Sequence, residues 1–225
     1  MKIDTVIFDL DGTLIDSAPS ILSSIIASFE EVGIKPAQPL TSNLVGPPVG
    51  LLFKSLLSDK NMKELPLLIE VFKRHYDELG YLETLVYKGV SEMLQELNQM
   101  QFRLYIATNK RIQPARKIIK HLGWTDLFME LYALDYCSPA FPHKAAMVKE
   151  LLHKTRRTGS KAIYIGDRNE DVDAALASDI PIIMAAWGYE DCIHRGADIA
   201  IAGTPREVIK LIREFNFEAH NEADY

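Results

Sequence analysis

The sequence predicts an α/β fold in which a doubly wound parallel sheet is interrupted by a helical insert. Residues 5–8 form a continuous apolar run, which is typical of a central strand covered on both faces. From Gly89 onward, strand-like and helix-like segments alternate, and this order implies right-handed crossovers between parallel strands. Between these two parts the chain shows helical periodicity.

After Gly89, strands are expected at residues 103–107, 162–165, 181–185 and 198–201. Helices are expected at residues 90–100, 113–122, 144–154, 171–177 and 205–215. Pro205 supports the start of the last helix, because its preset φ suits the first helical turn.

The insert is expected to pack as a small helical unit. Its first helix carries an apolar stripe at helical spacing, made of Ile21, Leu22, Ile25, Ile26 and Phe29. Further helices are expected near residues 51–57 and 65–76, between breaks rich in proline and glycine. We therefore expect a core domain of residues 1–16 and 87–225 and a helical cap domain of residues 17–86. The two connections, near residues 15–18 and 84–88, would be its hinges.

The composition is that of a folded globular protein, with 48% hydrophobic and 25% charged residues. A formal net charge of −6 argues against a nonspecific nucleic-acid surface. No apolar run reaches the length of a membrane span, and the first strand follows Met1 almost at once, so we expect a cytoplasmic protein without a signal peptide. Cys137 and Cys192 are too isolated for a metal cluster and are expected to be free thiols. A monomer and a homodimer both stay open.

Asp9 and Asp11 are the most informative pair, because they follow the first strand and lie two residues apart. The strand alternation directs both side chains to the same side, at the sheet edge where α/β proteins bind ligands. Two neighbouring carboxylates repel each other, and a metal cation would resolve that conflict. The alternative is that both residues only form the turn that Gly12 and Thr13 continue.

Residues 9–16, with the sequence DLDGTLID, resemble the DxDGTxxD motif of phosphatases in the haloacid dehalogenase-like (HAD) superfamily. The other segments that this family expects follow in order: Thr108-Asn109-Lys110 after a strand, Lys144 before a helix, and Gly166-Asp167 with Asp171 after a further strand. The resemblance spans nearly the whole chain. It implies a Rossmann-like core with a small helical cap.

The resemblance also implies roles for these residues. Asp9 would be the nucleophile that forms an aspartyl-phosphate, and Asp11 the general acid and then the general base. The resemblance assigns phosphate binding to Gly12, Thr13, Thr108, Asn109 and Lys144. Magnesium would be held by Asp9, the backbone carbonyl of Asp11 and Asp167, and Asp171 would either be a supporting ligand or lie behind these ligands without touching the metal.

Local alternatives exist for several of these residues. Thr108, Asn109 and Asp167 each precede an expected helix and could cap it. Lys144 could be an ordinary exposed helix lysine, and it is followed by Ala145 where many family phosphatases have proline.

The substrate class is also suggested by resemblance. Gly46-Pro47-Pro48, residues 76–89 and Trp187-Gly188-Tyr189 resemble the phosphoglycolate phosphatase-like branch. This implies a magnesium-dependent phosphatase that hydrolyses a small phosphomonoester. The alternatives are a phosphomutase of the β-phosphoglucomutase type, a nucleotidase or pyrophosphatase of the same fold, and a noncatalytic binding protein.

Overall fold

The core of the fold is a six-stranded parallel sheet, with strand order β5-β4-β1-β6-β7-β8. The computed structural model describes residues 2–155, 160–189 and 199–221. The strands are β1 (Lys2–Phe8), β4 (Arg103–Thr108), β5 (Glu130–Ala133), β6 (Ser160–Gly166), β7 (Ile182–Ala185) and β8 (Ala200–Ala202). Strand β1 lies at the centre, where it pairs with both β4 and β6.

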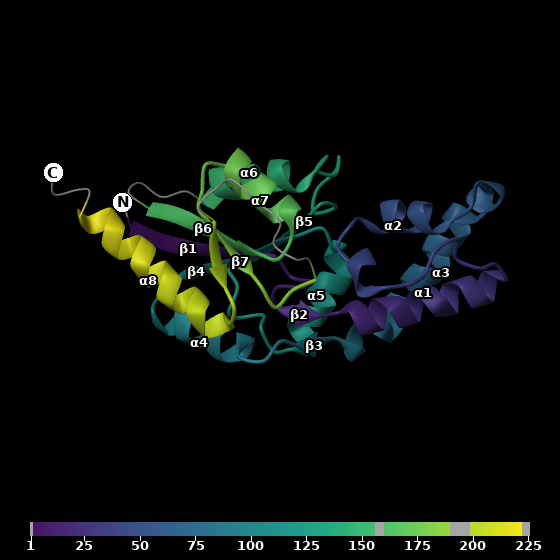
Figure 1. The fold of residues 1–225 in the computed structure, drawn as a ribbon, viewed down its shortest axis with the longest axis horizontal. Coiled ribbons are helices and arrows are strands. Elements are labelled where there is room, and N and C mark those ends of the chain that lie inside the picture. Colours follow the sequence, from purple (N-terminus) through teal and green to yellow (C-terminus); the bar gives the residue numbers. More distant parts are fainter. Residues whose placement is uncertain (1, 156–159, 190–198, 222–225) are drawn as a thin grey trace.

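Helices cover both faces of this sheet (Figure 1). One apolar core joins the sheet to α4 (Val90–Gln99), α5 (Ile112–His121) and α8 (Pro205–Asn221), and a second core joins it to α6 (Lys144–Thr155) and α7 (Asn169–Ala177). The expected α/β fold with a doubly wound parallel sheet is therefore confirmed.

The last three residues of β1, residues 6–8, are apolar without interruption because this part of the strand is covered on both faces. Val6 and Phe8 belong to the first core, whereas Ile7 belongs to the second, and all three are fully buried. Because successive side chains point to opposite faces, a strand covered on both sides needs an apolar residue at every position.

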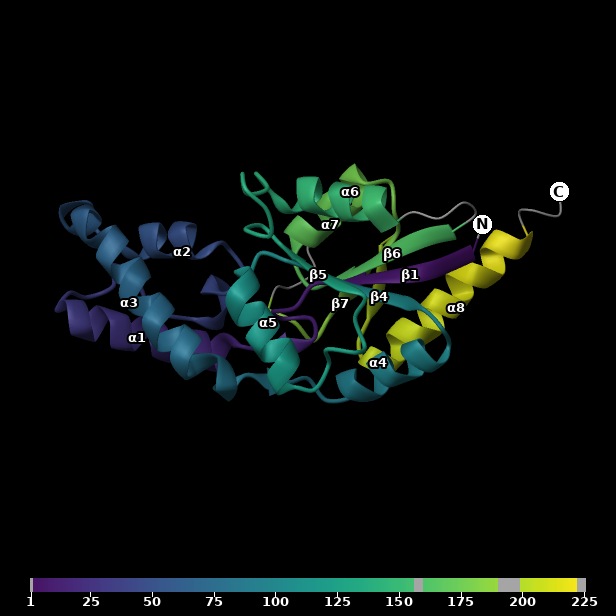
Figure 2. The same ribbon diagram turned by 180° about the vertical axis from the view of Figure 1, so that it is seen from behind.

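The helical insert leaves the core through β2 (Ile15–Asp16) and returns through β3 (Leu85–Val86), which pair as antiparallel strands. Between them lie the helices α1 (Ala18–Val32), α2 (Val49–Leu56) and α3 (Leu65–Glu78), and the short 3₁₀ helices η1 (Ser42–Leu44), η2 (Asp59–Glu64) and η3 (Gly80–Glu83). The insert has its own apolar core and extends from one end of the sheet (Figures 1 and 2).

Helix α1 packs differently from the expected stripe. Ile21, Ile25 and Phe29 of the stripe are buried, whereas Ile26 is 46% exposed. Small residues on the same helix are buried instead, namely Ser20, Ser24 and Ser28, and each hydroxyl donates to a backbone carbonyl in the preceding turn. Serines can be buried in this way because their polar atoms are satisfied within the helix.

The small serines of α1 permit η3 to pack closely against this helix. A Cβ on Gly80, at the start of η3, would lie 2.6 Å from Ser24 Oγ. Small side chains are therefore needed on both sides of this contact. The hydrophobic pattern of the sequence does not reveal this need.

One strand of the sheet, β5 (Glu130–Ala133), was not predicted from the sequence. This edge strand has four residues, a length at which an apolar pattern carries little information. The last expected strand is found at Ala200–Ala202, and residue 198 lies outside the described part. Cys137 is an exposed free thiol, and Cys192 lies outside the described residues. Among the described helices, none is long and apolar enough to cross a membrane.

Candidate active site

The carboxyl edge of the sheet gathers the side chains singled out in the sequence. Asp9 and Asp11 follow β1, Thr108 ends β4, and Asp167 follows β6. Lys144 begins α6, and Asp171 lies in the first turn of α7. All six side chains are buried. Because the three strands are parallel neighbours, their carboxyl ends meet at one place.

Asp9, Lys144 and Asp171 form a buried charged group. The Lys144 ammonium lies 3.1 Å from Asp9 Oδ1 and donates to Asp171 Oδ1 at 2.6 Å. The other oxygen of Asp171 accepts the backbone amides of Asp167 at 3.1 Å and Arg168 at 3.0 Å. Burial alone would lower the pKa of Lys144, but the carboxylates of Asp171 and Asp9 raise it well above its ordinary value. Lys144 is therefore a buried cation, not an exposed helix lysine.

Asp9, Asp167 and Asp171 can each offer one oxygen, and these three oxygens lie within 4.8 Å of one another. Asp9 Oδ1 is buried and makes no hydrogen bond within the described structure, although it lies near Lys144. Burial, together with the neighbouring carboxylates, raises the pKa of Asp9 to about 8, against the opposing effect of Lys144. Burial and Asp171 raise the pKa of Asp167 to about 7.

These observations fit a divalent cation. Carboxylate oxygens are hard ligands of the kind that Mg²⁺ prefers, and three buried carboxylates that lie close together beside Lys144 repel one another, which a divalent cation would offset. The residues present thus match the expected metal ligands Asp9, Asp167 and Asp171.

Gly12 and Thr13 support Asp167. Gly12 has φ +87°, and a Cβ at this position would lie 2.2 Å from Asp167 Oδ2. Thr13 Oγ1 donates to Asp167 Oδ1 at 3.0 Å, and the backbone amide of Tyr189 donates to Asp167 Oδ2 at 2.9 Å. The glycine is therefore required both by the turn and by the close approach of the carboxylate.

Asp11 has separate partners. Lys110 Nζ lies 2.9 and 3.2 Å from the two Asp11 oxygens, and the Ser17 hydroxyl donates to Asp11 Oδ1. Burial alone would lower the pKa of Lys110, but the Asp11 carboxylate outweighs this effect and raises it. The side chain of Asp11 is thus occupied outside the group of three carboxylates. Its expected contribution to a metal, through the backbone carbonyl, stays a prediction.

The expected phosphate ligands after β4 have different surroundings. Thr108 is 1% exposed, and its hydroxyl accepts the backbone amide of Lys110 at 3.2 Å. Asn109 Nδ2 donates to Glu170 Oε2 at 2.7 Å and to the Gly46 carbonyl at 3.4 Å. Both residues lie at the carboxyl end of β4, and phosphate binding by them stays a prediction.

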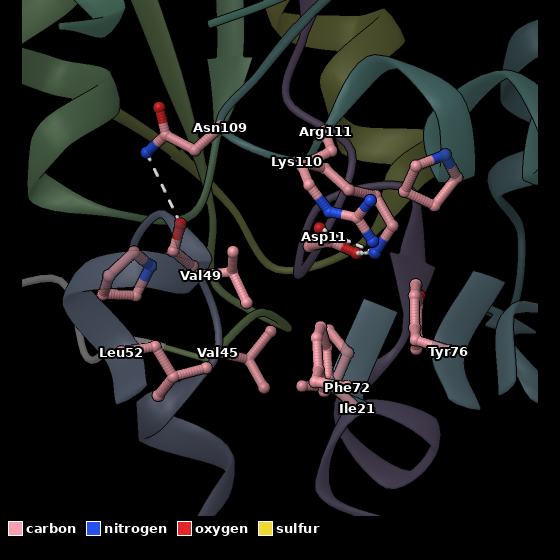
Figure 3. Close-up of a pocket in the computed structure, with 13 residues that line it drawn as sticks. Asp11, Ile21, Val45, Val49, Leu52, Phe72, Tyr76, Asn109, Lys110 and Arg111 are labelled. Carbon is pink, nitrogen blue, oxygen red and sulfur yellow. Dashed lines mark hydrogen bonds and ion pairs between the residues drawn. The ribbon is translucent and has the colours of Figure 1, made fainter. Parts of the chain in front are cut away.

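A small cavity of about 60 Å³ lies between the core and the insert, beside Asp11 (Figure 3). Lys110 and Asn109 reach it from the core, while Ile21, Phe72 and Tyr76 reach it from the insert. The Tyr76 hydroxyl is buried and has no hydrogen-bond partner among the described residues. The cavity thus combines apolar walls with polar groups that a ligand could satisfy.

Contacts between core and insert surround this cavity. Arg111, just before α5, makes a two-pronged ion pair with Asp77 of α3, with Nη1 2.8 Å from Oδ2 and Nη2 2.5 Å from Oδ1. The Lys110 ammonium also lies 4.7 Å from the centre of the Tyr76 ring. Cationic residues that follow β4 therefore bind the insert next to Asp11.

The roles of Lys110, Ser17 and Tyr189 were not predicted from the sequence. Lys110 appeared only as part of the Thr108-Asn109-Lys110 motif, since a single lysine after a strand carries no sign of its partner. Elementary chemistry could have pointed to Lys110 as the partner of Asp11. A buried Asp11 requires a cation or hydrogen-bond donors, and Lys110 follows a strand whose carboxyl end lies at the same edge of the sheet.

Lys110→Met is expected to destabilise the protein by about 3 kcal/mol, because it leaves the buried Asp11 carboxylate without its cation. Lys210→Met serves as the matched control, since Lys210 is 75% exposed and its ion pair with Glu214 is screened by solvent. Urea unfolding monitored by circular dichroism measures both changes. Equal stability of the two variants would contradict the importance of the Lys110–Asp11 pair.

The chain is similar in sequence to known proteins over most of its length. The haloacid dehalogenase-like hydrolase family model matches residues 6–185. A tyrosine-protein kinase PtkA from Mycobacterium tuberculosis is 31% identical over 185 residues, which cover 82% of this chain and 62% of PtkA. A phosphoglycolate phosphatase from Aquifex aeolicus is 28% identical over 208 residues, which cover 92% of this chain and 95% of that enzyme.

The chain is also similar to solved structures. The structure of a haloacid dehalogenase-like hydrolase, SP0104 from Streptococcus pneumoniae, has a TM-score of 0.81 and 28% sequence identity, and the match covers 93% of this chain and 98% of that one. The family match extends from the first strand through β7, and so includes every carboxylate of the site. The chain belongs to the haloacid dehalogenase-like hydrolase family.

Proposed function

We propose that this protein is a magnesium-dependent phosphatase that hydrolyses a small phosphomonoester through an aspartyl-phosphate on Asp9. One observation carries the proposal: Asp9 lies beside Lys144 in a buried group with Asp167 and Asp171, whereas Asp11 is held separately and faces the cavity. Two neighbouring carboxylates with different surroundings are suited to two different roles.

In the first half of the proposed reaction, an oxygen of Asp9 attacks phosphorus. A bond forms between that oxygen and phosphorus as the bond to the leaving alcohol breaks. Asp11, in its protonated form, gives its proton to the leaving oxygen. Lys144, fixed by Asp9 and Asp171, balances negative charge on the phosphoryl group.

In the second half, Asp11 takes a proton from water as the water oxygen attacks phosphorus. The bond from phosphorus to Asp9 then breaks, which releases inorganic phosphate and restores the Asp9 carboxylate. The Lys110 ammonium and the Ser17 hydroxyl keep Asp11 oriented for both steps. The proposed phosphate ligands are Gly12, Thr13, Thr108, Asn109 and Lys144.

Magnesium, held by Asp9, Asp167 and the backbone carbonyl of Asp11 with support from Asp171, would supply positive charge to the phosphoryl oxygens and to the nucleophile. Thr13 and the amide of Tyr189 orient Asp167 for this role. The amides of Asp167 and Arg168 orient Asp171.

We further propose that residues 1–16 and 87–225 act as a core domain and residues 17–86 as a cap domain that encloses the leaving group. The insert has its own apolar core, and its two connections pair at β2 and β3, which supports this division. The cavity beside Asp11 is about 60 Å³, a size that favours a small leaving group. A phosphoglycolate-like substrate is our first candidate, because full-length relatives are named phosphoglycolate phosphatases.

Phosphate release from phosphoglycolate, nucleoside monophosphates, sugar phosphates and pyrophosphate, each with magnesium or with EDTA, tests the proposal. We expect efficient, magnesium-dependent release from one small phosphomonoester. Transfer of phosphate to a sugar phosphate in place of release would identify a mutase. No release and no transfer from any substrate would contradict the proposed enzyme.

A further inference from the structure

Tyr189 connects parts of the chain that are far apart in sequence. It follows β7, and its hydroxyl accepts the backbone amides of Ser17 at 2.8 Å and Ala18 at 3.0 Å. The same hydroxyl donates to Asp16 Oδ1 at 3.0 Å. A tyrosine hydroxyl has one proton to donate and accepts up to two, so these three contacts use its full hydrogen-bonding capacity.

These contacts lie at the beginning of helix α1. Ser17 is the residue that precedes the helix, a position where a serine hydroxyl normally accepts an amide of the first turn. Here the Ser17 hydroxyl makes no such bond and donates to Asp11 instead. Tyr189 binds the amides of Ser17 and Ala18, which are not the amides that a serine cap accepts, and so it fixes the backbone of Ser17 while the Ser17 hydroxyl donates to Asp11.

The backbone near Tyr189 contacts Asp167, one of the three grouped carboxylates. Its amide donates to Asp167 Oδ2 at 2.9 Å, and a Cβ on the preceding Gly188 would lie 2.2 Å from Asp167 Cβ. The Tyr189 side chain also packs against the apolar core of the insert. One residue thus joins a carboxylate of the metal group, the entry to the insert and the serine that contacts Asp11.

We propose that Tyr189 is a positioning residue for the proton transfer by Asp11, and that it acts through Ser17. This inference rests on the proposed function. The Tyr189 hydroxyl fixes the backbone of Ser17, and Ser17 then fixes the Asp11 carboxyl group relative to the leaving oxygen. The proton moves from the Asp11 carboxyl to the oxygen of the departing alcohol as the bond between that oxygen and phosphorus breaks, so Asp11 becomes a carboxylate and the alcohol leaves neutral.

The test compares two leaving groups in the Tyr189→Phe variant. An alkyl phosphate, represented by phosphoglycolate, needs a proton on its leaving oxygen, whereas p-nitrophenyl phosphate releases a stable anion without one. The ratio kcat/KM is the readout, because it covers the steps up to departure of the leaving group and excludes the later attack by water. We expect kcat/KM to fall roughly tenfold or more for the alkyl phosphate and less than about threefold for p-nitrophenyl phosphate.

Two further variants examine the route through Ser17. Ser17→Ala should show the same difference between the two substrates. The double variant should lose little more than the more affected single variant, because both changes disturb the same contact with Asp11. Tyr132→Phe is the matched control, since this hydroxyl is buried without a hydrogen-bond partner among the described residues, and kcat/KM should stay unchanged for both substrates.

The outcomes separate the inference from the proposed function. Equal losses of kcat/KM for both substrates in Tyr189→Phe, or additive losses in the double variant, would overturn the positioning role while leaving a phosphatase. If phosphoglycolate is not hydrolysed, an alkyl phosphate of the panel that the wild type does hydrolyse replaces it. A wild-type protein that releases phosphate from no substrate of the panel would contradict the proposed function, and this inference with it.

Discussion

Asp9→Asn is expected to reduce phosphate release at least about 10³-fold while the protein stays folded. An amide cannot replace the carboxylate as a nucleophile toward phosphorus, so the proposed aspartyl-phosphate cannot form. The fold should tolerate the change. Asn has nearly the same shape as Asp, and it carries no charge into a buried group where the pKa of Asp9 is raised to about 8.

Phosphate release and thermal unfolding, measured on the same preparation, check both parts of this prediction. The expected melting temperature of Asp9→Asn in EDTA equals or exceeds that of the wild type, because the variant removes carboxylate repulsion. Asp59→Asn is a matched control on an exposed residue of η2 and should change neither property. Asp9→Asn with wild-type activity would overturn the proposed nucleophile and revive the noncatalytic alternative.

Magnesium is expected to raise the melting temperature at pH 8 by about 5–10 °C when its concentration is about 100 times its Kd. The cation would bind the folded protein, where Asp9, Asp167 and Asp171 are close together, and the unfolded chain would hold them apart. EDTA is expected to remove this stabilisation and to abolish phosphate release. Differential scanning fluorimetry with and without magnesium measures the shift.

The pH dependence in EDTA follows from the raised pKa values. Folding raises the pKa of Asp9 from 3.8 to about 8 and that of Asp167 from 3.8 to about 7. Below about pH 4 both carboxyls hold their protons in the folded and unfolded states, and their contribution to stability is fully present. As the pH rises toward 8, the unfolded chain loses these protons first, so the folded state loses stability. Magnesium should reduce this loss, because it binds the ionised carboxylates.

Asp167→Asn distinguishes a specific metal site from general salt effects. The variant keeps the size of the side chain but removes one of the three carboxylates, and it should lose most of the magnesium response in the melting temperature. Asp59→Asn should retain that response. An equal magnesium shift in Asp167→Asn and the wild type would contradict metal binding by Asp167.

The core was predictable because its signals are local. The apolar run of β1 and the alternation after Gly89 identified a parallel sheet covered on both faces, and most element boundaries differ by only one or two residues. Helix α8 continues to Asn221, beyond the expected end at residue 215. Strand β5 and the buried serines of α1 were missed, because a short edge strand and satisfied serines leave little trace in a hydrophobic pattern.

The sequence by itself determined which carboxylates meet at the carboxyl edge of the sheet, since Asp9, Asp167 and Asp171 each follow a strand in a regular α/β order. The tertiary structure decided their partners. Lys110 pairs with Asp11 across 99 positions of the chain, and the Tyr189 hydroxyl meets Ser17 across 172 positions. Such contacts depend on how loops from different strands and the insert pack together, and a single lysine, serine or tyrosine carries no local pattern from which its partner can be predicted.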